Sequence, residues 1–268
     1  MTNKPIKLVV TGCCGRMGSL IIQEALKDST HFQIAAAVEY PGHPQIGKPL
    51  EGHSRIIVRS DAELPALLQQ GADLIIEFTT PEATLTNAQH AAHAHIPIII
   101  GTTGFTQEQL KALTVLSKQI PIFWSPNMSI GIVIIRRAIN AISQLLFKFG
   151  LGERTRPQIS ETHHEKKKDK PSGTAKALAE ELFKATGWLI RDEEIEAKRE
   201  GEVIGIHAVT FDTGTEKILL HHEAMDRSVF AQGALLVAKN FHHLYDTHTN
   251  GMYGMDDFVT AMEKIKEA

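Results

Sequence analysis

The sequence predicts an α/β protein with a doubly wound parallel sheet in its first half and an α+β domain with an open, mixed sheet in its second. In the first half, short apolar runs alternate with amphipathic helical stretches, which is typical of parallel strands joined by crossover helices. In the second half, strand-like segments follow one another without helices between them, which favours a more antiparallel sheet.

The elements of the first domain can be placed along the chain from this alternation. Each predicted strand is a short apolar run, and each predicted helix has apolar residues at helical spacing. The strands are expected at 6–12, 32–39, 73–80, 96–101 and 120–124, and the helices at 16–28, 81–95 and 106–118.

A long helix at 128–150 begins the second domain, because Ile130, Val133, Ile142 and Leu146 recur there at helical spacing. Strands are then expected at the segments 156–164, 202–212 and 216–224, with a Gly-containing turn before the last one.

We therefore expect a dinucleotide-type domain over 1–127 and a second domain over 128–239. Helices expected at 228–241 and 256–268 could pack on either domain by their sequence alone.

Composition excludes several classes of protein. A chain of 268 residues with 43% hydrophobic and 22% charged residues is an ordinary globular protein rather than a disordered one. A net charge of -3 argues against a nucleic-acid partner. We also expect no membrane-spanning segment and no signal peptide. The two cysteines, Cys13 and Cys14, are neighbours and cannot form a disulfide framework, which favours a cytoplasmic location.

A glycine-rich turn, TGCCGRMG, joins the first strand to the first helix. Glycines allow a pyrophosphate to approach the backbone, and the helix N-terminus favours its negative charge. Glu39 ends the second strand, where an acid commonly binds the adenosine ribose. The pattern departs from G-x-G-x-x-G because Cys14 occupies the place of the second glycine, but its context predicts a Rossmann-like cofactor site. The predicted contacts in this part are Gly12, Cys13, Cys14, Gly15, Arg16, Met17 and Glu39.

Two further loops follow predicted strands of the same sheet. Because ligands of open α/β sheets bind beyond the carboxyl ends of the strands, both loops are candidates for the nicotinamide half of the cofactor. Their residue types are also common in ordinary turns. The predicted contacts are Gly101, Thr102, Thr103, Ser125, Pro126, Asn127 and Met128.

The stretch ETHHEKKKDKPSGTAKA, from Glu161, admits four interpretations. A metal site is disfavoured, because adjacent histidines on a strand point to opposite faces, and we predict none. A nucleic-acid patch would extend past Pro171. A solvated lysine loop remains open for most of the lysines. The fourth interpretation is a site for a small anion, because Pro-Ser-Gly-Thr starts a helix whose free N–H groups attract a carboxylate.

Together with the glycine turn, this stretch resembles the 4-hydroxy-tetrahydrodipicolinate reductase (dihydrodipicolinate reductase) family over nearly the whole chain. The resemblance rests on TGCCGRMG, Glu39, EFTTPEAT, GTTG, SPNMSIG and, above all, HHEKKKDKPSGTA. It implies reduction of a cyclic dicarboxylic substrate by NADH or NADPH, on the diaminopimelate route to lysine. It also implies a homotetramer, and a C-terminal segment, 240–268, that returns to the nucleotide domain.

The resemblance also assigns roles to individual residues. His163 and Lys167 are implied as the proton-transfer residues. His164, Gly173 and Thr174 are implied as substrate contacts. Lys166 and Lys168 inherit no role.

The pair Glu39 and Tyr40 predicts a preference for NADH, since the acid repels a 2′-phosphate and no arginine follows it. Lys48 or Arg55 could still approach such a phosphate. Two other functions stay open on the sequence alone. They are another two-domain nicotinamide oxidoreductase acting on a different small acid, and a nucleotide-sensing binding protein with this fold.

Overall fold

A computed structural model describes residues 4–244 and 250–267, and they form two compact units. One unit contains 1–128 and 228–268, and the other contains 129–227. Residues 1–3, 245–249 and 268, which belong to the predicted domain ranges and the last predicted helix, lie outside the described residues.

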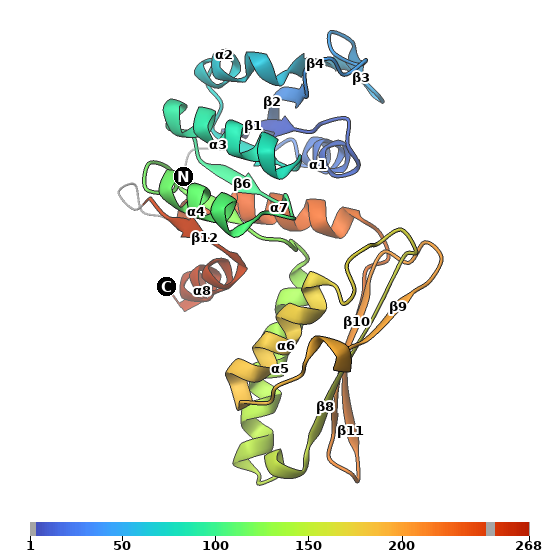
Figure 1. The fold of residues 1–268 in the computed structure, drawn as a ribbon. Helices are drawn as coiled ribbons and strands as arrows, with labels where there is room; N and C mark the ends of the chain where they lie inside the picture. The colour runs from blue at the N-terminus through green and yellow to red at the C-terminus, as the bar shows by residue number, and fades with distance from the viewer. Residues whose placement is uncertain (1–3, 245–249, 268) are drawn as a thin grey trace. The chain divides into compact units, whose positions relative to one another are not determined.

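The first unit is built on an eight-stranded sheet in the order β12-β7-β6-β5-β1-β2-β4-β3 (Figure 1). All neighbouring strands are parallel except the β3–β4 pair. Its strands are β1 (Ile6–Thr11), β2 (Phe32–Glu39), β3 (Pro49–Leu50), β4 (His53–Ser60), β5 (Leu74–Glu77), β6 (Ile98–Ile100), β7 (Ile122–Trp124) and β12 (Met252–Tyr253). Strands β3 and β4 were not predicted, because they have little buried apolar surface.

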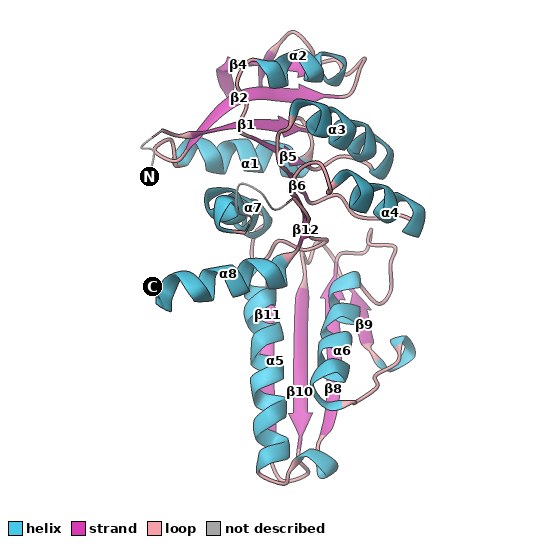
Figure 2. Ribbon diagram, turned by 90° about the vertical axis from the view of Figure 1, so that its left-hand side faces the viewer, coloured by secondary structure: helices cyan, strands magenta, loops and turns pink. Residues whose placement is uncertain are grey.

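Helices cover both faces of this sheet, as Figure 2 shows. One face carries α1 and α7, and the other carries α2, α3 and α4. Parallel strands buried on both faces need apolar residues throughout, and β6 is three buried isoleucines. The helices are α1 (Arg16–Lys27), α2 (Leu64–Gln69), α3 (Pro81–Ala94), α4 (Gln107–Leu116), α7 (Ser228–Asn240) and α8 (Met255–Glu267), with short 3-10 turns η1 (Asp61–Glu63) and η4 (Phe241–His243).

The C-terminal part rejoins the first unit at Ser228, twelve residues before the predicted return at residue 240. The reason is that α7 packs along α1, where Gln232 donates a hydrogen bond to Glu24. Strand β12 then extends the sheet beside β7.

The second unit packs two helices on one face of a four-stranded sheet, β11-β10-β8-β9 (Figure 2). Strands β11, β10 and β8 are antiparallel, whereas β8 and β9 are parallel, so the sheet is mixed. Its elements are α5 (Ile130–Lys148), η2 (Gly152–Arg154), β8 (Arg156–His163), α6 (Gly173–Thr186), η3 (Asp192–Glu194), β9 (Glu196–Arg199), β10 (Ile206–Asp212) and β11 (Lys217–Glu223).

Helix α5 is 19 residues long and, by length and composition alone, apolar enough to cross a membrane. The expectation of no membrane-spanning segment did not anticipate a helix of this length and composition. One face of the helix packs in the core of the second unit. Ile135 and Ile139 are buried against α6 and the sheet, and Arg136 forms an ion pair with Glu181 of α6.

Candidate active site

The glycine turn closes tightly between β1 and α1. Gly12 has a φ of 66°, and a Cβ there would lie 2.7 Å from the carbonyl oxygen of Phe78. A Cβ on Gly18 would lie 2.1 Å from the carbonyl oxygen of Gly12. Only glycine fits at both positions, which keeps the start of α1 open to a pyrophosphate. The N-cap of helix α1 is Gly15, and no side chain forms a capping hydrogen bond there.

Glu39 is fixed beside this turn at the end of β2. Its Oε2 accepts a hydrogen bond of 2.9 Å from the amide of Cys14, and its Oε1 accepts one from the amide of Tyr40. The carboxylate is thus oriented before any ligand arrives, in a position suited to ribose hydroxyl groups.

A cavity of about 370 Å³ opens at this edge of the sheet, at the carboxyl ends of β1, β2 and β5. Strand β1 lies between β5 and β2, so the order of the strands reverses its direction at this point. Doubly wound sheets bind nucleotides at such a switch point. The residues therefore fit the adenosine half of a nicotinamide dinucleotide. The cavity is lined by Thr11, Gly12, Gly15, Val38, Glu39, Tyr40, Asp61, Phe78, Thr79, Thr80, Ala83 and Asn87.

Of the remaining predicted turn residues, Cys13 is buried and its amide donates to the carbonyl of Val38. Burial raises the pKa of the Cys13 thiol, which lies 3.8 Å from that of Cys14. Both are free cysteines. Arg16 is exposed and Met17 half-buried at the start of α1.

The loop after β6 contacts the residues that follow β5, Phe78 and Thr79. A Cβ on Gly101 would collide with the ring of Phe78. Thr102 is buried, and its hydroxyl oxygen accepts from the Thr79 amide, while Thr103 is exposed.

The loop after β7 contains the other predicted cofactor contacts, from Ser125 to Met128. Ser125 is buried, and its hydroxyl donates to the carbonyl of Asn127. Pro126 is exposed, whereas Met128 is buried. Both loops thus leave the carboxyl ends of neighbouring parallel strands, as predicted.

In the second unit, the structure brings His163 together with a carboxylate that the sequence analysis had not singled out. Glu161 and His163 lie on one face of β8, and His163 Nδ1 is 2.8 Å from Glu161 Oε2. Arg199 donates two hydrogen bonds of 3.1 Å to Glu161 Oε1, and the Ser172 amide donates a third. His207 completes the cluster, with its ring centroid 4.9 Å from that of His163.

Lys167 follows in the loop after β8, and its Nζ pairs with Asp169 Oδ2 at 2.9 Å. Burial would raise the pKa of Asp169, but the hydrogen bond and charge of Lys167 and the amide of Gly173 lower it. One carboxylate of the protein is thus already stabilised by Lys167 and the N-terminus of α6.

The predicted substrate contacts flank this point. Gly173 opens α6, and a Cβ there would meet no atom within 4 Å, so its surroundings are open. Thr174 is half-buried in the first turn of α6. Ser172 caps the helix by accepting from the Ala175 amide. His164 is half-buried, and burial, together with the charge of Arg227, lowers its pKa.

Electrostatics divide the buried cluster into a charged and a neutral part. Burial would raise the pKa of Glu161, but His163, Ser172 and Arg199 lower it to about 2, so this side chain is a carboxylate. Burial lowers the pKa of His207 to about 3, with a further contribution from His163, so His207 is neutral.

Four residues of this cluster were not predicted from the sequence: Glu161, Arg199, Gly205 and His207. For Glu161 a signal existed, because residues two apart on a strand share a face. A Cβ on Gly205 would lie 3.1 Å from His163 Nε2, so this glycine keeps a side chain away from that atom. Arg199 lies opposite His163 across the β8–β9 pair, and sequence alone does not give that register.

Among the residues that the structure describes, two groups have ligand atoms close enough for a metal. They are Glu161 with His163 and His207, and Cys13 with Cys14 and Glu39. In the first, Arg199 and Ser172 donate to Glu161 Oε1, and Oε2 lies 2.8 Å from His163 Nδ1. In the second, both oxygens of Glu39 accept backbone hydrogen bonds. We assign neither group to a metal.

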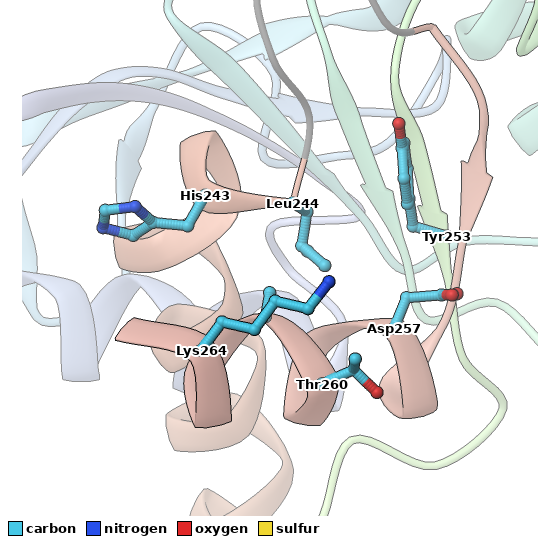
Figure 3. A pocket seen from close by; sticks show the side chains of 7 residues that line it. His243, Leu244, Tyr253, Asp257, Thr260 and Lys264 are labelled. Atoms are coloured by element: carbon cyan, nitrogen blue, oxygen red, sulfur yellow. The ribbon is translucent and has the colours of Figure 1, made fainter. Parts of the chain in front are cut away.

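Another hollow in the first unit, of about 450 Å³, is lined by residues of η4, β12 and α8. Figure 3 shows their side chains. Lys264, Asp257 and Thr260 come from α8, and Tyr253 comes from β12. None of its lining residues is a predicted site residue.

Both halves of the chain match models of one protein family. The profile described as dihydrodipicolinate reductase, N-terminus, matches residues 6–128, and the one described as dihydrodipicolinate reductase, C-terminus, matches residues 131–259. The chain belongs to the dihydrodipicolinate reductase family.

Relatives support the family assignment over the full length. The 4-hydroxy-tetrahydrodipicolinate reductase of Lawsonia intracellularis is 37% identical, covering 87% of this chain and 93% of the relative. The protein of that name from Buchnera aphidicola is 33% identical, with 99% and 100% covered.

Among solved structures, a dipicolinate-bound dihydrodipicolinate reductase from Paenisporosarcina sp. TG-14 shares this fold. Its TM-score is 0.72 at 20% identity, with 93% of this chain and 97% of that chain covered. The family thus agrees with the Rossmann-like first unit and the mixed sheet of the second.

The two lowered pKa values imply that mild acid destabilises the protein. His207 and Glu161 both have a lower pKa when folded, so protons bind more readily to the unfolded chain. The stability that neutral His207 contributes is complete at pH values above its ordinary pKa of 6.5, and it is lost as the pH falls toward its pKa of about 3 in the folded protein. The stability that the Glu161 carboxylate contributes is lost as the pH falls from its ordinary pKa of 4.5 toward its folded pKa of about 2.

Between pH 6.5 and 4.5, the free energy of unfolding of the wild type should fall as the pH is lowered. We expect His207→Gln to reduce this fall by on the order of 2 kcal/mol. Urea unfolding at a series of pH values measures this. The exposed His221→Gln serves as the control and should reproduce the wild-type slope. If the free energy of unfolding had the same slope against pH in His207→Gln and wild type, His207 would not be the buried neutral histidine described above.

Proposed function

We propose that this protein is an NAD(P)H-dependent 4-hydroxy-tetrahydrodipicolinate reductase, which forms tetrahydrodipicolinate on the diaminopimelate route to lysine. The observation that carries the proposal is the arrangement of His163 against a buried carboxylate, with Lys167 paired to Asp169 in the loop that leads to α6. Family membership over both units supports the same reaction. A protein that only senses nucleotides would not need this proton-transfer cluster.

The residues suit the reduction of a small dicarboxylate. When bound, the nicotinamide cofactor supplies a hydride. His163, assisted by Lys167, supplies the proton to the electron-rich carbon or nitrogen of the substrate. His164 and the amides of Gly173 and Thr174 bind the substrate carboxylates. Lys167 and α6 already stabilise the Asp169 carboxylate, which supports this role.

For the cofactor, we infer a preference for NADH. Glu39 and Asp61 both line the cavity near the expected ribose, and their carboxylates repel a 2′-phosphate. Lys48 and Arg55 are not among the described residues that line it. The cofactor contacts are proposed to be the turn from Gly12 to Met17, Glu39 and the two strand-end loops.

We also propose a homotetramer assembled through the sheet of the second unit. Helices α5 and α6 cover one face of this sheet, while Leu219 of β11 is 58% exposed. A cytoplasmic location is proposed as well, because the neighbouring Cys13 and Cys14 are free thiols.

Replacement of the proton-transfer residues tests the function directly. We expect His163→Gln and Lys167→Ala each to lower kcat about 10²-fold or more, since general acid catalysis contributes that much. The assay is cofactor oxidation with substrate supplied fresh by the preceding enzyme of the pathway. Lys168→Ala, an exposed neighbour in the same loop, is the control and should keep wild-type kcat. Near-normal turnover of both site variants would refute these roles.

The cofactor preference is tested by kcat/KM with each cofactor at saturating substrate. We expect a higher value with NADH than with NADPH. We expect Glu39→Ala to narrow the difference, because it removes one of the two repelling carboxylates. A kcat/KM at least tenfold higher with NADPH would overturn the preference.

The assembly is tested by light scattering during size-exclusion chromatography. We expect a mass about four times the chain mass of 29.6 kDa. Leu219→Asp should lower this mass, because it places a charge on the uncovered sheet face. Leu189→Asp, at a side chain that is 71% exposed away from the strands, is the matched control. A monomeric wild-type protein would contradict the proposal.

A further inference from the structure

Glu161 is a buried charge in the second unit. Its side chain has 0% relative exposure, and an isolated carboxylate would be costly to bury in this way. The protein stabilises it through one oxygen. Two N–H groups of Arg199 and the amide of Ser172 all donate to Oε1.

The other oxygen, Oε2, is directed at His163. It lies 2.8 Å from Nδ1, which is within the distance of a charge-assisted hydrogen bond. Both atoms are buried, and neither has another hydrogen-bond partner among the described residues.

Arg199 holds the carboxylate in this orientation. Its Nε donates to the carbonyl of Lys167, and its Nη2 donates to that of Asp169. The guanidinium therefore joins the strand of Glu161 to the loop of Lys167. Because Oε1 is engaged by three donors, the carboxylate cannot turn Oε2 away from His163 without breaking them.

His207 does not compete for Oε2. Its Nε2 lies 3.3 Å from the Ser172 hydroxyl and 3.9 Å from Glu161 Oε2. The Ser172 oxygen accepts from the Ala175 amide, so its own proton is available for His207. His207 Nε2 thus forms its hydrogen bond with Ser172 and leaves Oε2 to His163.

Building on the proposed role of His163, we propose that Glu161 is a positioning residue. It holds His163 with Nδ1 protonated, so that Nε2 is the atom that gives its proton to the substrate. Gly205 keeps a side chain from covering Nε2. The proton balance is simple. The imidazolium loses its Nε2 proton to the substrate, the neutral ring keeps Nδ1–H against the carboxylate, and water returns a proton to Nε2.

The tautomer can be observed in the wild-type protein. Nitrogen NMR of ¹⁵N-histidine-labelled enzyme at alkaline pH, with His163 assigned from its absence in His163→Gln, should show a protonated Nδ1 and an unprotonated Nε2. An Nε2–H tautomer would overturn the proposal. This measurement needs no turnover, so it decides the role of Glu161 even if the proposed reaction is absent.

Variants of Glu161 extend the test. Glu161→Gln can present either its oxygen or its nitrogen to Nδ1. We therefore expect the nitrogen spectrum of this variant to show a second tautomer of His163. We also expect kcat to be about 10²-fold lower, with KM changed less than about threefold. Glu161→Asp keeps the charge and should be intermediate. Glu196→Gln, an exposed glutamate on β9, is the matched control and should behave as wild type. A kcat of Glu161→Gln within about threefold of wild type would refute the inference.

Discussion

The buried ion pair between Glu161 and Arg199 is the interaction on which the second unit's site depends. It joins strand β8 to strand β9, the N-terminus of α6 through Ser172, and the lysine loop through two carbonyl groups. A buried pair of this kind contributes little net stability compared with apolar packing, but breaking it leaves an uncompensated charge. Its value lies in geometry, because a single carboxylate fixes elements that are far apart in the sequence.

The first unit relies on close backbone contact instead of charge. The carbonyl of Gly12 lies against Gly18, and the ring of Phe78 lies against Gly101, so the absence of side chains shapes the cofactor edge. Glu39 is then held by backbone amides of the turn and of Tyr40. A carboxylate oriented in this way loses little further freedom when a ligand binds, which favours affinity.

Much of this arrangement could be predicted from the sequence, because its signals are local. Alternating apolar runs predicted the parallel sheet, and the Pro-Ser-Gly-Thr cluster predicted the start of α6 that the structure has at Gly173. What was missed depends on register and distant pairing. Arg199 and His207 reach Glu161 from two other strands, and no pattern within β9 or β10 shows which residues face it. The return of the chain at Ser228 was likewise set by packing of α7 on α1.

The discontinuous make-up of the first unit bears on how the chain is made. The second unit is continuous, from Ser129 to Arg227, and all its strands and both its helices emerge from the ribosome before α7 does. The first unit lacks α7 and the edge strand β12 until residues 228–253 have been synthesised. During synthesis, the internal unit is therefore the first that can complete its fold, and the unit containing the N-terminus is the last.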